Sequence, residues 1–134
     1  MAGKSIHLEL LPGLYAVSQL SPAAPVPSWA DGEGFVSIGR TEEELSVVCL
    51  EARVPSGVKT DGGWRCFKFQ GPFAFDQTGI LSSVLEPLAR AEVGIFAVST
   101  FNTDYLLVKT ENLERTVAAL EAAGHLVQAA SRAG

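Results

Sequence analysis

Apolar residues recur with helical spacing in two stretches of the second half of the chain. They fall on one helical face in residues 79–93 and again in residues 110–123, at Leu81, Val84, Leu85 and Leu88 and at Leu113, Val117 and Leu120. An amphipathic helix packs such a stripe against a core. The pattern therefore predicts two helices. Pro87 lies inside the first, and we expect a kink or an irregular turn there because proline has no amide.

Apolar and β-branched runs bounded by turn residues predict the strands. In the second half they cover residues 64–71, 95–100, 105–109 and 125–129, and in the first half 35–39, 45–50 and two runs within 6–20. The turn signal Asp61-Gly62-Gly63 precedes the run at 64–71. Asp76 or Thr78 is the predicted N-cap of the first helix, and Thr110 that of the second. The second half thus has the order β-α-β-β-α-β of a ferredoxin-like unit.

The first half reads as a looser copy of the second. Residues 36–48 (VSIGRTEEELSVV) and 98–108 (VSTFNTDYLLV) share Val-Ser, a Thr four residues after that Ser, acidic residues and an apolar strand. This is a weak internal repeat. Residues 21–34 have room for one short helix near Trp29, and residues 51–63 have no room for a full helix. We expect an α+β protein of two units, 1–63 and 64–134, the first degenerate.

Composition narrows the class of protein. The 134 residues are 47% hydrophobic and 19% charged, with a net charge of −5 and no basic stripe, so nucleic acid is not an expected partner. Apolar surface left by so few charges would be covered in a homo-oligomer. No run of eighteen apolar residues suggests a membrane span, and no secretory signal pattern is seen, so we expect a cytoplasmic protein.

Candidate catalytic and metal-binding residues are sparse. Cys49 and Cys66 share no CxxC motif and read as buried thiols, with a disulfide as the minority interpretation. His7 and His125 have no partner at metal-ligand spacing, so no zinc site is predicted. No nucleophile elbow and no dinucleotide-binding glycine pattern is present. We therefore expect no catalytic residue, no metal, no cofactor and no enzymatic activity.

Residues 99–108 (STFNTDYLLV) place an aromatic, an amide, hydroxyls and a carboxylate between two apolar strands. Asn, Thr and Asp are common turn formers, and the same groups suit a small-molecule site, so both interpretations stay open here. Phe101 is equally compatible with a packed strand end and with a ligand wall.

Two segments together resemble the ACT domain family: Asp76-Gln77-Thr78-Gly79-Ile80-Leu81, and Ser99-Thr100-Phe101 followed by Asp104. The resemblance is strongest over residues 64–120. It is closest to small tandem ACT proteins related to aspartate kinase regulatory domains and to cytosolic arginine sensors. It implies two ferredoxin-like units in tandem, binding of an amino acid at an interface between ACT units, and a homodimer.

Matching the family motif residue by residue implies a ligand site made by Asp76, Gln77, Gly79, Ile80, Thr100, Phe101 and Asp104, with Gly94 and Ile95 from a neighbouring chain. The helix start at Gly79 and Ile80 suits a carboxylate, since its first amides are unpaired. Asp104 and the strand-end carbonyls suit an ammonium group. The arginine sensors carry an acidic residue in place of Gln77, which argues against arginine, because a guanidinium favours paired carboxylates.

Three functions follow as hypotheses. The first is a stand-alone regulatory module that binds an amino acid and acts on an unidentified protein partner. The second is a constitutive interaction module that keeps the architecture without a ligand. The third, an enzyme, has the least support because no paired acid and base are found. The first depends on whether the helix start after Thr78 and the bend after Thr100 face a common crevice sized for a zwitterion.

Overall fold

The computed structural model describes residues 5–70 and 79–129. The chain forms two compact units. Residues 13–64 form one, which we call the inserted unit. The residues up to Pro12, together with those from Arg65 onward, form the other, which we call the split unit. The chain therefore passes between the units twice.

The inserted unit is a small antiparallel sheet with the strand order β3-β4-β2-β5. Its strands are β2 (Tyr15–Leu20), β3 (Ser37–Arg40), β4 (Leu45–Leu50) and the first part of β5 (Lys59–Phe69). Short 3-10 helices stand where a ferredoxin-like unit has its helices, at Ser28–Ala30 and Glu51–Arg53. The predicted degenerate first unit is confirmed, with each helix reduced to a single turn.

Arg53 stabilises the first of these turns. Its guanidinium donates to the carbonyl oxygens of Trp29, Ala30 and Glu33 at 3.1, 3.3 and 2.9 Å. The planar, multiply donating guanidinium suits such convergent carbonyls, which a short turn leaves without amide partners. Ala30 is fully buried in a small core with Leu45, Val47 and Cys49, and the turn thus covers one face of the sheet.

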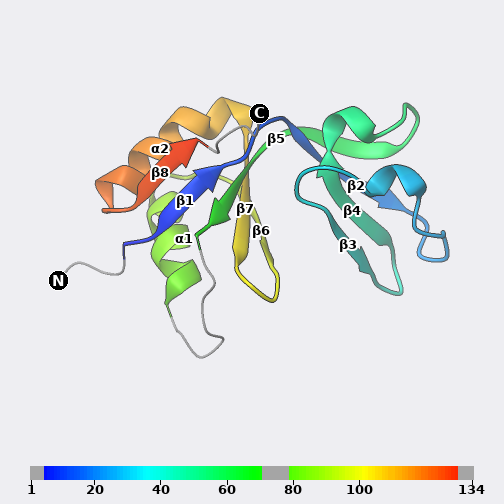
Figure 1. Ribbon diagram of the computed structural model, residues 1–134, viewed down its shortest axis with the longest axis horizontal. Coiled ribbons are helices and arrows are strands. Elements are labelled where there is room, and N and C mark those ends of the chain that lie inside the picture. The colour runs from blue at the N-terminus through cyan, green and yellow to red at the C-terminus, as the bar shows by residue number, and fades with distance from the viewer. Residues whose placement is uncertain (1–4, 71–78, 130–134) are drawn as a thin grey trace. The chain divides into compact units, whose positions relative to one another are not determined.

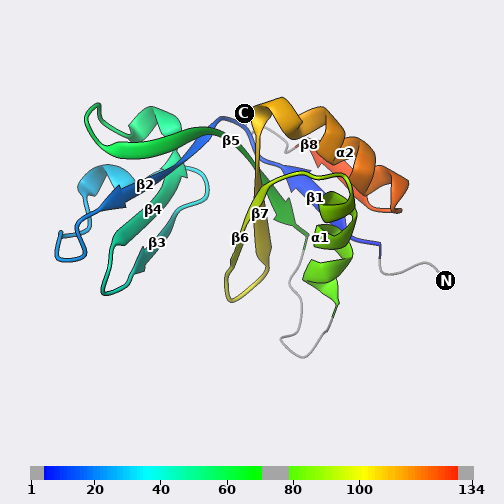
Figure 2. The ribbon, with the colours of Figure 1, turned by 180° about the vertical axis from the view of Figure 1, so that it is seen from behind.

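The split unit has the strand order β6-β7-β5-β1-β8, with both longer helices on one face of the sheet (Figures 1 and 2). Its elements are β1 (His7–Leu10), the second part of β5, α1 (Ile80–Arg90), β6 (Ile95–Ser99), β7 (Asp104–Lys109), a 3-10 turn (Thr110–Asn112), α2 (Leu113–Ala122) and β8 (Leu126–Ala129). Without β1, this is the complete β-α-β-β-α-β unit predicted for the second half.

β1 lies between the first and the last strand of that unit. It pairs antiparallel with β5 and parallel with β8. Leu8 faces the core beneath the helices, which is made of alternate strand residues and one stripe of each helix: Ile6, Leu8, Phe67, Phe69, Ile80, Val84, Leu88, Val93, Leu106, Val108 and Leu120. The chain's first strand therefore completes the core of a unit formed mainly by its second half. As a division into repeat units, the boundary between residues 63 and 64 stays a prediction.

The predicted turn at Asp61-Gly62-Gly63 is wrong, because β5 continues through these residues. Tyr15 pairs with Trp64 and Val17 with Asp61, so three steps on β5 oppose two on β2. This is a β-bulge. Gly63 has φ +77, a left-handed conformation that glycine adopts without strain, and its amide donates to the Glu51 carboxylate at 2.7 Å.

The predicted helix caps also need correction. Gly79, with φ +80, is the N-cap residue of α1, and as a glycine it has no side chain to cap the first turn. Asp76 and Thr78 lie outside the described residues. Thr110 begins a 3-10 turn instead of capping α2, for which Asn112 is the N-cap residue. Gly124, with φ +94, ends α2 as predicted.

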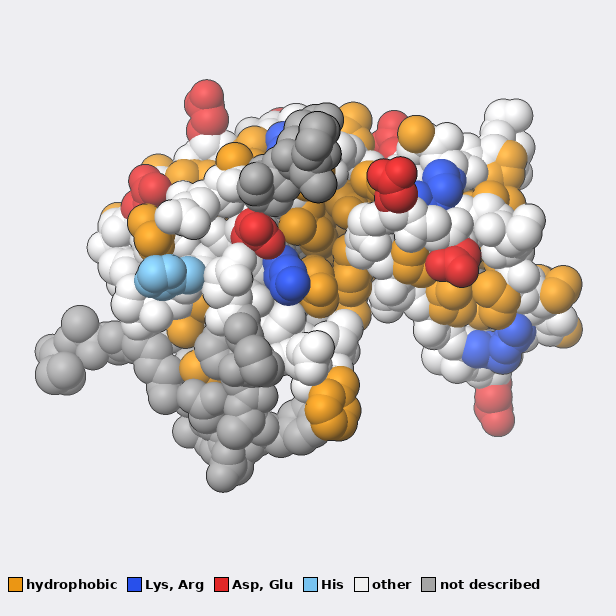
Figure 3. Space-filling model, in the orientation of Figure 1, with side chains coloured by type: hydrophobic (Ala, Val, Ile, Leu, Met, Phe, Trp, Pro, Cys, Tyr) orange, Lys and Arg blue, Asp and Glu red, His pale blue; other side chains and the backbone are white. Residues whose placement is uncertain are grey.

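Three further predictions concern the surface charge, the two cysteines and membrane-spanning helices. On the face shown in Figure 3, acidic and basic side chains are scattered and form no basic patch. Cys49 and Cys66 are both buried free thiols, which confirms the main interpretation. Within residues 5–70 and 79–129, no helix is both long and apolar enough to cross a membrane.

Candidate functional site

The β6–β7 hairpin closes with a four-residue bend from Thr100 to Thr103. The Thr100 amide donates to the Thr103 carbonyl at 2.8 Å, and the Thr100 hydroxyl donates to the same oxygen at 2.9 Å. The buried Thr103 hydroxyl donates to the Phe69 carbonyl at 2.9 Å and so ties the bend to β5. The bend is held in place by its own hydroxyls.

Asp104 begins β7 directly after the bend. It pairs across the hairpin with Ser99, whose hydroxyl donates to the Asp104 carboxylate. The carboxylate is half-buried, and its second oxygen keeps further acceptor capacity. Asp104 is thus more than a turn former, because the hydroxyl of Ser99 orients it.

The start of α1 faces the same hollow as Asp104. A groove of about 610 Å³ runs along α1 and reaches the hairpin; its lining is Gly79, Ile80, Leu81, Ser82, Leu85, Glu86, Ala89, Ser99 and Asp104. The first amides of a helix have no intrahelical acceptor, and they carry partial positive charge. No atom of the described residues lies within 4 Å of the place that a Cβ on Gly79 would take, so on that side the helix start is open.

The groove contains only part of the predicted site. It brings together Gly79, Ile80 and Asp104. Thr100 and Phe101 lie in the bend and do not line it, and Phe101 is 81% exposed, so it is not a packed strand end.

The other predicted site residues lie elsewhere in the chain. Gly94 and Ile95 are at the far end of β6 from the bend, outside the groove lining. Asp76 and Gln77 lie outside the described residues.

Sequence reasoning missed the helical wall of the groove. The helical spacing predicts Leu81 and Leu85 as core residues, but they are only partly buried and line the groove as well. Ser82, Glu86 and Ala89 share their side of the helix at spacings of four and three residues. The sequence sign of a groove was this stripe beside the predicted core face of the helix, together with Ser99 opposite Asp104.

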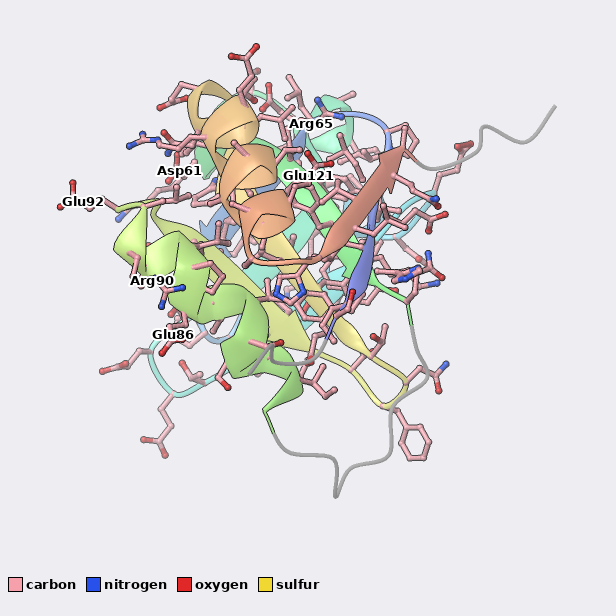
Figure 4. All side chains as sticks on the ribbon, turned by 90° about the vertical axis from the view of Figure 1, so that its left-hand side faces the viewer. Asp61, Arg65, Glu86, Arg90, Glu92 and Glu121 are labelled. Atoms are coloured by element: carbon pink, nitrogen blue, oxygen red, sulfur yellow. The ribbon has the colours of Figure 1, made fainter. Side chains whose placement is uncertain are left out.

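Charge in and around the groove is mainly acidic. Glu86 lies 3.1 Å from Arg90 in an exposed ion pair on the outer side of α1 (Figure 4), so solvent screens their attraction. Asp104 adds a second carboxylate to the lining, and none of the lining residues that the structure describes is Lys, Arg or His. The groove therefore offers an acidic group, open helix amides and an apolar wall.

Shifted pKa values in the described residues are caused chiefly by burial. Burial raises the pKa of the Tyr105 hydroxyl, with smaller contributions from Cys66 and Glu9. Burial also raises the pKa of Cys49, against the opposing charge of Arg53. Among the described residues, no group of three His, Cys, Asp or Glu side chains is placed to hold a metal ion.

Comparison with known proteins identifies similar families and folds. Residues 59–122 match the family model described as the ACT domain, and residues 13–57 match a model described as an N-terminal domain. The human cytosolic arginine sensor for mTORC1 subunit 1 is 34% identical over 94 residues, which is 66% of this chain and 27% of the sensor. The chain thus spans about a quarter of the length of the curated relatives it matches.

Two solved structures extend the comparison. A crystal structure of a protein from Agobacterium tumefaciens is 51% identical, has a TM-score of 0.92 and matches 98% of each chain. The regulatory subunit of aspartate kinase from Thermus flavus has a TM-score of 0.61 at 9% identity, over 92% of this chain and 99% of that one. The second likeness is one of fold alone.

Proposed function

Because residues 59–122 match the model of the ACT domain family, we propose that the chain is a regulatory module that binds a free amino acid. The observation that carries the proposal is the groove in which the start of α1 and the Asp104 carboxylate meet. The similarity to the protein named as a cytosolic arginine sensor supports it.

The groove matches the chemistry of a zwitterion. The ligand carboxylate is placed at the first amides of α1, where no side chain on Gly79 blocks the approach. The ligand ammonium is placed at Asp104, as a charge-assisted hydrogen bond. The ligand side chain lies along Leu81 and Leu85.

The wider site remains part of the proposal. Asp76, Gln77, Thr100 and Phe101 contribute from the flanking segments, and Gly94 and Ile95 of a neighbouring chain complete the site in a cytoplasmic homodimer. The ligand acts by linkage: it stabilises the arrangement that offers it the better contacts, and so shifts association with the partner. The module itself catalyses no reaction.

Calorimetric titration against each of the twenty amino acids tests the proposal. We expect at least one to bind, with heat and a raised melting temperature, and Asp104→Asn to weaken that binding tenfold or more, since the ammonium loses its ionic acceptor. Asp31→Asn is the matched control, because Asp31 is exposed in the inserted unit. If no amino acid gives heat or stabilisation at millimolar concentration, the proposal fails.

The exposed Phe101 favours a second candidate function, a constitutive interaction module without a ligand. An aromatic side chain presented at a hairpin bend is typical of interface anchors. Asp104→Ala separates the two functions. In a ligand-free interaction module, this change leaves association with the partner unaltered, and no amino acid binds to the unmodified protein.

A further inference from the structure

His125 lies buried in the turn between α2 and β8 and joins two distant parts of the split unit. The Ile6 amide donates to its Nδ1 at 3.0 Å, and its Nε2 lies 2.8 Å from the Ser83 carbonyl oxygen in α1. Only 5% of the residue is exposed. One imidazole ring thus connects the groove helix to the residue just before β1.

The Ser83 carbonyl needs this contact because of Pro87. In a regular α-helix the carbonyl of residue 83 accepts from the amide of residue 87, and proline has no amide. Pro87 lies inside α1 and is buried. His125, 42 positions away along the chain, supplies a donor where the helix lacks one.

The two contacts determine which ring nitrogen carries the proton. A backbone amide only donates and a carbonyl only accepts, so Nδ1 must be the acceptor and Nε2 the donor. The neutral Nε2–H tautomer alone satisfies both. The Ile6 carbonyl in turn accepts from the Leu126 amide at 3.0 Å, so the same backbone segment also begins the β1–β8 pairing.

We propose that His125 is a positioning residue that replaces the helical hydrogen bond missing at Pro87 and thereby fixes the groove helix to the N-terminal segment of the split unit. The placement of Leu81 and Leu85 along the groove depends on this ring. The inference concerns the ligand-free protein, and all its tests are made without ligand. It therefore stands or fails separately from the proposed function.

The imidazole tautomer is the first test. Nitrogen NMR of the wild-type protein at neutral pH is expected to show the His125 proton on Nε2. A proton on Nδ1 overturns the proposal, since the Ile6 amide would then face another donor. This measurement needs no variant and does not depend on whether a substitution folds.

A double-mutant cycle is the second test. Asn at position 125 keeps an acceptor near Nδ1 and removes the donor at Nε2. His125→Asn is expected to lower the folding equilibrium constant about tenfold in the wild-type background. In the Pro87→Ala background, the new amide at position 87 donates to the Ser83 carbonyl. There, His125→Asn is expected to lower the folding equilibrium constant less than threefold. Equal costs in the two backgrounds overturn the proposal.

Amide hydrogen exchange adds a readout specific to position. In His125→Asn, the Leu85 amide in α1 is expected to exchange at least fivefold faster, and the Val47 amide in the inserted unit at an unchanged rate. His7→Asn, at the exposed histidine of β1, is the matched control and should alter neither. Uniform acceleration of both amides would show a general loss of stability and overturn the positioning role.

Discussion

Cys66 shows how one buried side chain makes stability depend on pH. It lies in β5 of the split unit with none of its surface exposed. Burial raises the pKa of its thiol from 9.0 to about 12, because the thiolate loses its hydration there. The folded state therefore holds the thiol proton over a range in which the unfolded chain has already released it.

This shift predicts a loss of stability in alkali. The contribution of the protonated thiol to the free energy of unfolding is fully present below about pH 9. It is lost as pH rises toward 12, by on the order of 1 kcal/mol per pH unit. Urea unfolding at a series of pH values measures it. Cys66→Ala lowers the free energy of unfolding at every pH, because the lost thiol leaves a cavity. It should, however, reduce the decline of that free energy in alkali. An unchanged slope in the variant would show that other groups, such as Tyr105, account for the dependence.

At the level of the element, the start of α1 depends on a conformation that glycine adopts readily. Gly79 has φ +80, and a Cβ there would touch none of the described residues within 4 Å. A side chain at this position is therefore resisted by the backbone and not by crowding.

Gly79→Ala is accordingly expected to destabilise the split unit by about 1 kcal/mol. Gly94→Ala is the matched control, because Gly94 also has open space around it but no positive φ. Thermal unfolding of both variants measures the difference. Equal effects would mean that the cost at Gly79 does not come from its backbone conformation.

The sequence predicts correctly whether a segment is a helix or a strand wherever the apolar pattern extends over many residues. The stripes of α1 and α2 and the runs at β2 and β4 predicted those elements because each buries one face. The pair Gly62-Gly63 predicts a turn but forms a bulge, since glycine pairs occur in both and only the pairing with β2 distinguishes them. The groove was predicted in part: Gly79 and Asp104 carry recognisable motifs, but Leu81 and Leu85 serve core and groove alike, which no period reveals.

For the whole molecule, the main feature is that the inserted unit interrupts a hairpin of the split unit. Leu10 pairs with Phe67 across β1 and β5, and the Leu11 amide donates to the Cys66 carbonyl at 2.8 Å. Pro12 and Arg65 are thus placed as neighbours at the end of a ladder. The 52 residues between them leave and return at one point.

Replacing residues 13–64 by Asn-Gly should therefore leave a protein that still unfolds cooperatively, with slowly exchanging amides in β1, β5 and β7. Asn-Gly forms the tight turn that suits two antiparallel strands. A control that also deletes Pro12 shifts the register by one residue and should not fold, since a one-residue shift turns Leu8 to the wrong face. Loss of cooperative unfolding in the first variant would show that the split unit needs the inserted one.

The position of β1 also bears on how the chain folds during translation. β1 is synthesised before both of its neighbours in the sheet, β5 and β8. Domains usually fold in the order of their synthesis. All residues of the inserted unit are synthesised between β1 and the second part of β5, so Leu8 has no strand partner until residue 69 has been made, and β1 gains its second neighbour only when β8 follows.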